Sequence, residues 1–169
     1  MTYRMAVTGA ITGTIIALGC SAEPSAPETT PTVLAVVPAS GTTNVDPTLP
    51  LTVTFSHSMA SGMEVNVVLH EGTVSGVQVS GTAVWSSDRR TLTFTPSQAL
   101  RSGTVYALHL AGNMRSSGGQ MVNHAMCEGL GGQRVTAGMM GGGQRPGMMG
   151  PGWQGSDGAY GMVFTFTTA

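Results

Sequence analysis

Soft sulfur ligands and imidazoles gather in the C-terminal third of this sequence. Eight of the 12 methionines lie from Met114 onward, and His124 and Cys127 stand close together in the same region. Thioether, thiolate and imidazole groups suit Cu(I), and a thioether binds without first losing a proton. These residue types therefore raise soft-metal binding, of Cu(I) or Ag(I), as one chemistry this chain could perform.

The same region has a competing interpretation as a passive or partner-contacting flexible loop. Residues 118–161 hold 15 of the 25 glycines, and a Gly-Met-Met-Gly pattern at Gly138 recurs nine residues later at Gly147. Glycine makes a segment costly to order, and low-complexity sequence often stays without a fixed fold. Between Asn123 and Gly161, Leu130 and Val135 are the only branched aliphatic residues, so we expect this insert to contribute no core.

Motifs of the common enzyme classes are incomplete here. His70-Glu71 begins like a zinc-protease motif but lacks the second histidine, and Gly150–Gly155 matches a dinucleotide fingerprint outside a strand-to-helix turn. The chain has no lysine, no Gly-x-Ser-x-Gly and no Cys-x-x-Cys. Its formal net charge of -1 provides no basic field for phosphates. We therefore expect no enzyme and no nucleic-acid partner.

The first twenty residues have the pattern of an export signal. Arg4 precedes the apolar stretch Met5–Leu18, which is shorter than the roughly 20 residues that a membrane span needs. The stretch ends in Ala17-Leu18-Gly19-Cys20, which resembles a bacterial lipoprotein box. This resemblance implies a signal peptide over residues 1–19 and an acylated Cys20. Ser21, in place of Asp, then favours the outer membrane, on its periplasmic or surface face, over the inner membrane.

A proline-rich segment follows the cysteine. Residues 20–32 contain three prolines and no large apolar side chain, so they offer nothing to pack. Such a segment extends by about 3.1 Å per residue, and its 12 residues after the cysteine could span roughly 35 Å. We interpret it as a tether between a lipid anchor and a domain over 33–169. The membrane is then one partner, and envelope proteins or polymers are others.

From Val33 onward, short alternating runs are separated by turn residues about every ten positions. With 41% hydrophobic and 9% charged residues, this part has enough apolar surface to fold. Alternation of apolar residues with threonine predicts strands with one buried face, and many short strands predict an all-β sandwich. The expected strands are Val33–Val37, Leu51–Phe55, Glu64–His70, Gly76–Ser80, Thr82–Trp85, Thr91–Thr95, Thr104–Leu110 and Met162–Thr168.

Five motifs in order carry a family resemblance. They are Val37–Val45, Val53–Met59, Thr91–Pro96, Leu100–Tyr106 and Phe164–Thr168. Together they resemble the SbsA-type bacterial Ig-like domain of surface and envelope proteins, over residues 33 to about 122 and 162–169. The resemblance implies a Greek-key sandwich that serves as a spacer, adhesion or assembly module and supplies no catalytic residues.

The spacing Leu100-x-x-Gly103-x-x-Tyr106 also has a physical interpretation. In Greek-key sandwiches a tyrosine at this place bonds back to the connection that precedes its strand, an arrangement known as the tyrosine corner. We therefore expect the Tyr106 hydroxyl to contact the backbone a few residues upstream.

The Ig-like topology brings two loops to one end of the sandwich. One is the loop after Leu51–Phe55, and the other is an insert at about 124–161 before the last strand. Side chains from both could form a soft-metal site. The candidate ligands are His57, Met59, Met63, His124, Met126 and Cys127, with Met139, Met140, Met148 and Met149 in reserve.

Overall fold

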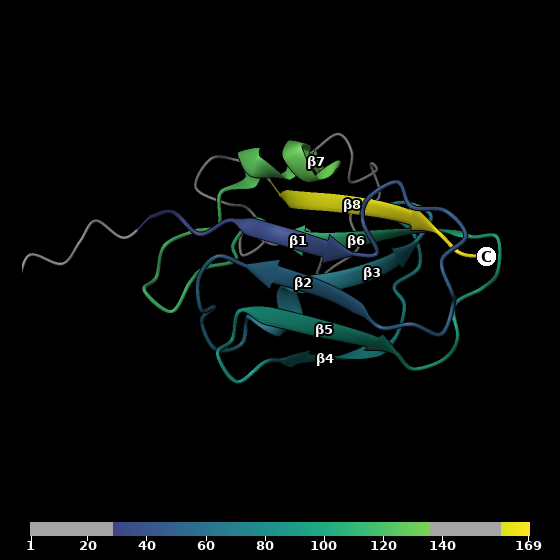
Figure 1. Cartoon of the computed structure of the whole chain (residues 1–169), viewed down its shortest axis with the longest axis horizontal. Coiled ribbons are helices and arrows are strands. Elements are labelled where there is room, and N and C mark those ends of the chain that lie inside the picture. Colours follow the sequence, from purple (N-terminus) through teal and green to yellow (C-terminus); the bar gives the residue numbers. More distant parts are fainter. Residues whose placement is uncertain (1–28, 136–159) are drawn as a thin grey trace, which may run out of the picture.

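The computed structural model describes residues 29–135 and 160–169, and every structural statement below concerns these residues. Two four-stranded antiparallel sheets face each other, in the strand orders β1-β2-β5-β4 and β3-β6-β8-β7 (Figure 1). The strands are β1 (Val33–Val37), β2 (Leu51–Phe55), β3 (Val67–Glu71), β4 (Gly81–Trp85), β5 (Thr91–Pro96), β6 (Val105–Ala111), β7 (Gln133–Arg134) and β8 (Gly161–Thr167). The expected all-β, Ig-like sandwich is confirmed.

The first sheet follows the predicted alternation. Leu51, Val53 and Phe55 of β2 are buried between the sheets, whereas the threonines between them face outward. The same holds for β5, where Leu92 and Phe94 are buried. β1 and β2 have the bounds predicted from the sequence. β2 is a clean period-two run, whereas β1 buries Val33 and Val36 because its pairing with β2 shifts register between Val33 and Ala35.

Two expected strands differ from the structure. Met63–Asn66 forms the short 3-10 helix η1, because Gly62 adopts a left-handed φ of 81° and turns the chain before β3 begins. Residues 76–80 form no regular strand. They make two backbone bonds to β3, from Glu71 N–H to Val77 and from Val79 N–H to Leu69, and then cross to the other sheet.

The first part of the insert is built into the fold. His124–Leu130 forms the 3-10 helix η2, whose start is capped by the Asn123 side chain, which accepts from Ala125 N–H at 3.0 Å. The short strand β7 then pairs with β8. Cys127 and Val135 are fully buried, so the expectation that this segment adds no core is wrong. Cys127 and Val135 add to the buried apolar interior because each packs against residues that the sandwich supplies.

The second sheet is buried on both faces. Its inner face contributes Leu69, Leu108 and Phe164 to the main core. Its outer face carries a second cluster, composed of Val74, Ala107, Val135 and Val163 with Tyr160 packed against it. This explains why β6 is apolar along almost its whole length. No helix in the described part of the chain is long and apolar enough to cross a membrane.

Candidate functional site

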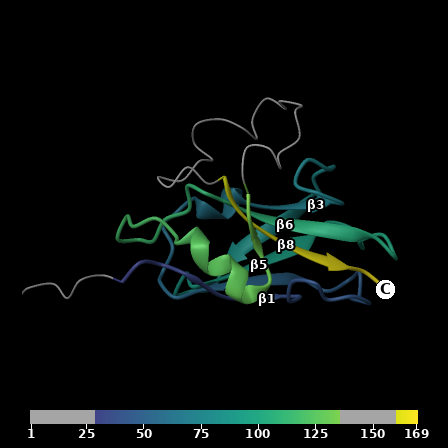
Figure 2. The same cartoon turned by 90° about the horizontal axis from the view of Figure 1, so that it is seen from above.

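The chain joins the sandwich at the end that carries the loop after β2 and the segment after β6. Thr32 and Ser56 are joined by two hydrogen bonds of 2.9 Å, from Thr32 N–H to Ser56 Oγ and from Ser56 N–H to Thr32 O. Asn123 N–H donates to Pro31 O at 2.8 Å. Figures 1 and 2 show the chain entering the sandwich at this end, with the C-terminus at the opposite end of the domain.

The loop after β2 is bonded at this end to residues 115–117, which follow β6 and precede the predicted insert. Ala60 N–H donates to Arg115 O at 3.0 Å, and Ser117 N–H donates to Ser58 O at 2.8 Å. Met59 and Ser116 form an antiparallel bridge between these bonds. The Arg89 side chain supports the loop from the other side by donating to Met59 O at 2.7 Å and to Ala60 O. The backbone of the predicted site is therefore held in place by hydrogen bonds.

The candidate side chains on the β2 loop face different surroundings. His57 is partly exposed, and its ring lies 2.8 Å from Ser56 Oγ and 3.2 Å from Thr29 Oγ1. Met59 is fully buried in the main core. Met63 packs against the same core, and its sulfur accepts from Asn66 Nδ2 at 3.6 Å. Two of these three groups thus serve packing.

The candidates on η2 are also turned inward. His124 and Cys127 are 2% and 0% exposed. Burial, with a smaller contribution from the Glu128 carboxylate, raises the pKa of the Cys127 thiol above its usual value. The thiolate is the form that binds metals, so this environment holds the sulfur in its weakly ligating form.

The structure describes only some of the predicted ligands. Cys20, Met139, Met140, Met148 and Met149 lie outside the described residues, as does the side chain of Met126. Within residues 29–135 and 160–169, no three His, Cys, Asp or Glu side chains are grouped as a metal site would require. The described part of the site is thus an ordered loop junction whose potential ligands, apart from His57, are packed inside.

A pair of buried histidines lies on the outer face of the second sheet, where the sequence pointed to no site. The rings of His70 on β3 and His109 on β6 have centroids 6.3 Å apart. His70 Nδ1 lies 3.2 Å from Gly76 O, and His109 Nε2 lies 2.9 Å from Tyr160 O. Since a carbonyl oxygen only accepts, each of these nitrogens carries the proton.

Burial controls the charge of His109. Desolvation lowers the pKa of His109 from 6.5 to about 4, against the opposing effect of the bond to the Tyr160 carbonyl and with a smaller lowering by His70. The sequence of β6 carried a signal for this burial. The strand has no charged residue on either face, which is typical of a strand that is covered on both sides.

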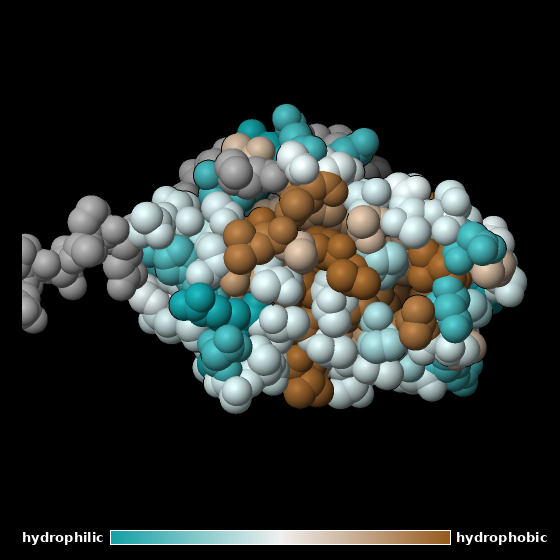
Figure 3. Space-filling view, viewed as in Figure 1, coloured by the Kyte–Doolittle hydropathy of each residue, from teal (hydrophilic) through white to brown (hydrophobic). Residues whose placement is uncertain are grey.

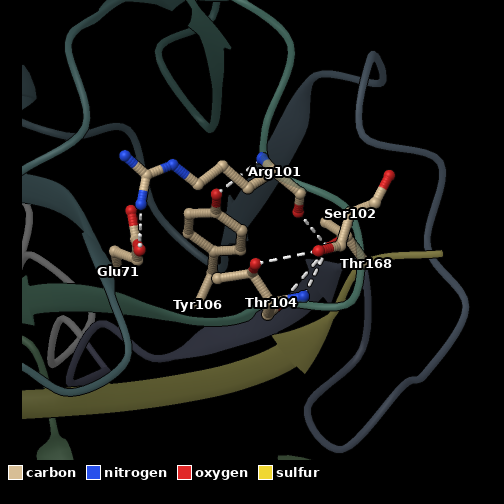
Figure 4. A network of polar contacts seen from close by, with 6 residues as sticks. All are labelled: Glu71, Arg101, Ser102, Thr104, Tyr106 and Thr168. Carbon is tan, nitrogen blue, oxygen red and sulfur yellow. Dashed lines mark hydrogen bonds and ion pairs between the residues drawn. The ribbon is translucent and has the colours of Figure 1, made fainter.

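The predicted tyrosine corner is present at the opposite end (Figure 4). The Tyr106 hydroxyl accepts from Arg101 N–H at 2.8 Å, and its ring stacks on Phe166 with centroids 5.7 Å apart. Thr168 Oγ1 donates to Arg101 O and accepts from Thr104 N–H at 3.0 Å. The connection before β6 is thereby fastened to both β6 and the chain end after β8.

The two-sheet sandwich and its tyrosine corner place this domain in the class of Ig-like domains. Residues 27–126 match the family described as bacterial Ig-like domain, which is more than half of the chain. The chain belongs to this family, which suggests an extracytoplasmic protein. A search of curated proteins found no match.

Several solved structures are similar at low identity. The N-terminal part of the bacterial S-layer protein SbsC is 21% identical over 56% of this chain and 22% of that one, with a TM-score of 0.42. PcoC, a methionine-rich copper resistance protein from Escherichia coli, is 16% identical over 56% of this chain and all of that one, with a TM-score of 0.44. L,D-transpeptidase 1 from Mycobacterium tuberculosis is 17% identical over 55% of this chain and 38% of that one, with a TM-score of 0.38. At these scores, the similarities do not bear on the function of this chain.

Proposed function

We propose that this chain is a non-catalytic lipoprotein of the cell envelope, acylated at Cys20, whose SbsA-type Ig-like domain acts as a structural or interaction module. The observation that carries this proposal is the attachment of residues 29–32 to the domain. Both loops at that end bond to the incoming chain, through Thr32 to Ser56 and through Pro31 to Asn123. A tether pulled from an N-terminal anchor would therefore pull on an ordered junction, not on a loose end.

The same attachment gives the domain a direction relative to an anchor. The end that carries the β2 loop and the start of η2 lies nearer the anchored terminus, whereas the tyrosine corner and the C-terminus lie at the far end (Figure 1). An extended tether of about 3.1 Å per residue leaves the domain room to contact envelope proteins or polymers. Two or more acyl chains make such anchoring stable.

The two cysteines provide a matched test of the anchor. Cys20→Ser should move the protein from the membrane fraction to the soluble fraction and abolish labelling by a fatty acid. Cys127→Ser changes the other cysteine, which is buried in the core, and should leave both readouts unchanged. Membrane association that survives Cys20→Ser would contradict the proposal.

Soft-metal binding by the loop ligands is the second candidate function. The observation in its favour is the bridge between Met59 and Ser116, which fixes the ligand-bearing β2 loop to the segment that leads into the insert. Because Met59 and Cys127 are fully buried, we propose that Met139, Met140, Met148 and Met149 would supply most of the ligands. These four residues lie outside the described part of the chain.

Titration with Cu(I) against a competing chelator tests this second candidate. Replacement of the four methionines by leucine should abolish retention of the metal, whereas His57→Ala should weaken it. Equal retention by the native chain and the four-leucine variant would exclude these methionines as ligands. Because the test measures metal and not fractionation, it is independent of the anchor.

A further inference from the structure

β4 is an open edge of the first sheet. β4 pairs with β5, and a backbone hydrogen bond lies just beyond each end of the paired residues. These bonds run from Ser86 N–H to Thr91 O at 2.8 Å and from Ser97 N–H to Ser80 O at 2.9 Å. Hydrogen-bonded pairs alternate along an antiparallel ladder, so Thr82 and Val84 also bond to β5. Gly81, Ala83 and Trp85 therefore direct their N–H and C=O groups away from the sheet. None of these groups has a backbone or side-chain partner among the described residues.

The other edges of the sandwich are protected. Val77 and Val79 bond to the edge of β3, and both β7 and segment 41–45 pair with β8. β1 carries a register shift between Val33 and Ala35, continues into Pro38, and has η2 packed beside it. Bulges, prolines and covering elements are the usual means of blocking an edge strand. β4 has no bulge and no proline, and the short helix η1 beside it contacts Trp85 on the inner side through Glu64.

β4 itself is uncharged and accessible, with Glu64 and Arg89 close to its Trp85 ring. Its five residues include no charged side chain and no proline, and Val84 is 58% exposed. The outward face of the sheet beside it is lined by threonines of β2 and β5, and Figure 3 shows it as mostly neutral in colour with some apolar patches. A hollow of about 470 Å³ opens along the inner side of the edge, lined in part by Val65, Val79, Ala83 and Phe94.

We propose that β4 pairs with β4 of a second copy of this chain, antiparallel and centred on Ala83. In this register Ala83 faces Ala83 of the other copy, and Gly81 faces Trp85. Each copy presents three N–H and three C=O groups, and this one register satisfies all of them. The two copies are then related by a two-fold axis, and their first sheets join into one continuous sheet.

The side chains of β4 favour this register. On the inner face the large ring of Trp85 lies next to Gly81 of the other copy, where the Phe94 ring of that copy occupies the place of a side chain. The Trp85 ring is held in position by its bond to Glu64 Oε2 at 2.9 Å and by Phe55, whose ring centroid is 5.7 Å away. On the outer face Thr82 lies opposite Val84, a pair of β-branched residues that packs well across strands. No like charges meet.

A second copy is the partner that this edge fits best, because the strand is complementary to itself in both hydrogen bonding and side-chain size. One strand edge makes a small interface, of the kind found in weak or transient complexes. Confinement of both copies to one membrane surface would raise their effective concentration. The inference thus names a partner for the proposed interaction module and rests on that proposed function for its physiological setting.

Cysteine pairing tests the register in the full chain. Thr82 and Val84 face each other as a non-hydrogen-bonded pair, with Cα atoms about 4.5 Å apart, which is within disulfide range. Co-expressed Thr82→Cys and Val84→Cys chains of different tag length should form a mixed disulfide under mild oxidation. Pairs of like chains should form few, because their cysteines are diagonal. Thr95→Cys, on the neighbouring strand, is the control and should not cross-link.

A charge variant tests the edge independently of cysteines. Thr82→Lys with Val84→Lys places like charges opposite each other across the two-fold axis and should weaken dimerisation at least about tenfold. Leu34→Lys with Leu49→Lys adds the same charge at exposed positions away from β4 and should have no effect. If the first variant fails to fold, Ala83→Pro removes an outward N–H without removing a bond to β5. Dimer mass is measured by light scattering, corrected for detergent where needed.

These experiments separate the inference from the proposed function. Cross-linking is measured in whichever fraction contains the protein, so a loss of membrane anchoring does not affect the result. The proposed pairing of β4 with β4 would be overturned if mixed and identical pairs of the Thr82→Cys and Val84→Cys chains cross-linked equally, or if neither cross-linked. A native chain that stays monomeric at about 1 mM, the concentration at which even a complex of about 4 kcal/mol is half formed, would overturn it as well.

Discussion

Replacing Tyr106 by Phe removes one oxygen atom from the tyrosine corner and keeps the aromatic ring. The ring is 2% exposed and would still stack on Phe166, so the packing of the core should change little. The lost contact is the 2.8 Å bond from Arg101 N–H. That N–H is then left in a partly buried place without its acceptor, which costs about 1–3 kcal/mol of unfolding free energy.

Urea denaturation gives the magnitude directly. For a domain of this size the slope of the unfolding free energy is about 1–3 kcal/mol per molar urea, so the midpoint should fall by roughly 1 M with the slope unchanged. Thr95→Val is the control. It removes a hydroxyl from an exposed position on β5 and should change stability by less than about 0.5 kcal/mol.

The Tyr106 and Thr168 hydroxyls act on the same peptide region, since Thr168 donates to the Arg101 carbonyl. A double-mutant cycle of Tyr106→Phe with Thr168→Val should therefore give a coupling energy of about 0.5 kcal/mol or more. A loss below about 0.5 kcal/mol for Tyr106→Phe would refute the role given to this bond. Additive effects of the two changes would refute the network.

Three further predictions concern the second sheet and the insert. The folded-state pKa of His109, about 4, lies below its unfolded value of 6.5. Its contribution to stability should therefore be complete above pH 6.5 and fall by roughly 3 kcal/mol toward pH 4. Denaturation measured across this pH range should show a smaller fall for His109→Gln. Replacement of residues 136–159 by a short Asn-Gly turn should leave a cooperatively unfolding β-domain, because Tyr160 N–H bonds to Val135 O and Val135 N–H to Gly161 O; loss of cooperative unfolding would contradict this. Alkylation of Cys127 should be at least about a hundredfold slower in the native protein than in urea, and equal rates would show that its thiol is not buried in solution.

The strands of the first sheet could be predicted to within one residue at each end. β2 alternates strictly, and period-two alternation has one physical cause, a strand with one face in the core and the other in water. The tyrosine corner was also predictable, because its geometry depends on a short, local spacing. Residues 76–80 show the limit of this reasoning. They alternate like a strand, yet the crossing between sheets leaves them only two bonds to β3.

The candidate site was predictable in its backbone but not in its side chains. Topology alone brings the β2 loop and the segment after β6 to one end, where the Met59–Ser116 bridge joins them. Composition could not show that Met59 and Cys127 point inward. Sulfur-bearing side chains are both soft ligands and good core residues, so the sequence left both roles open.

The sequence by itself determined an all-β sandwich, the positions of most of its strands and the tyrosine corner, because these depend on local periodicity and spacing. Only the tertiary structure decided what lies next to what. It buried Cys127, brought His70 and His109 together across β3 and β6, and left β4 as the edge with open hydrogen-bonding groups. Burial, pKa and edge pairing depend on contacts between residues far apart in the chain, and no local pattern records those contacts.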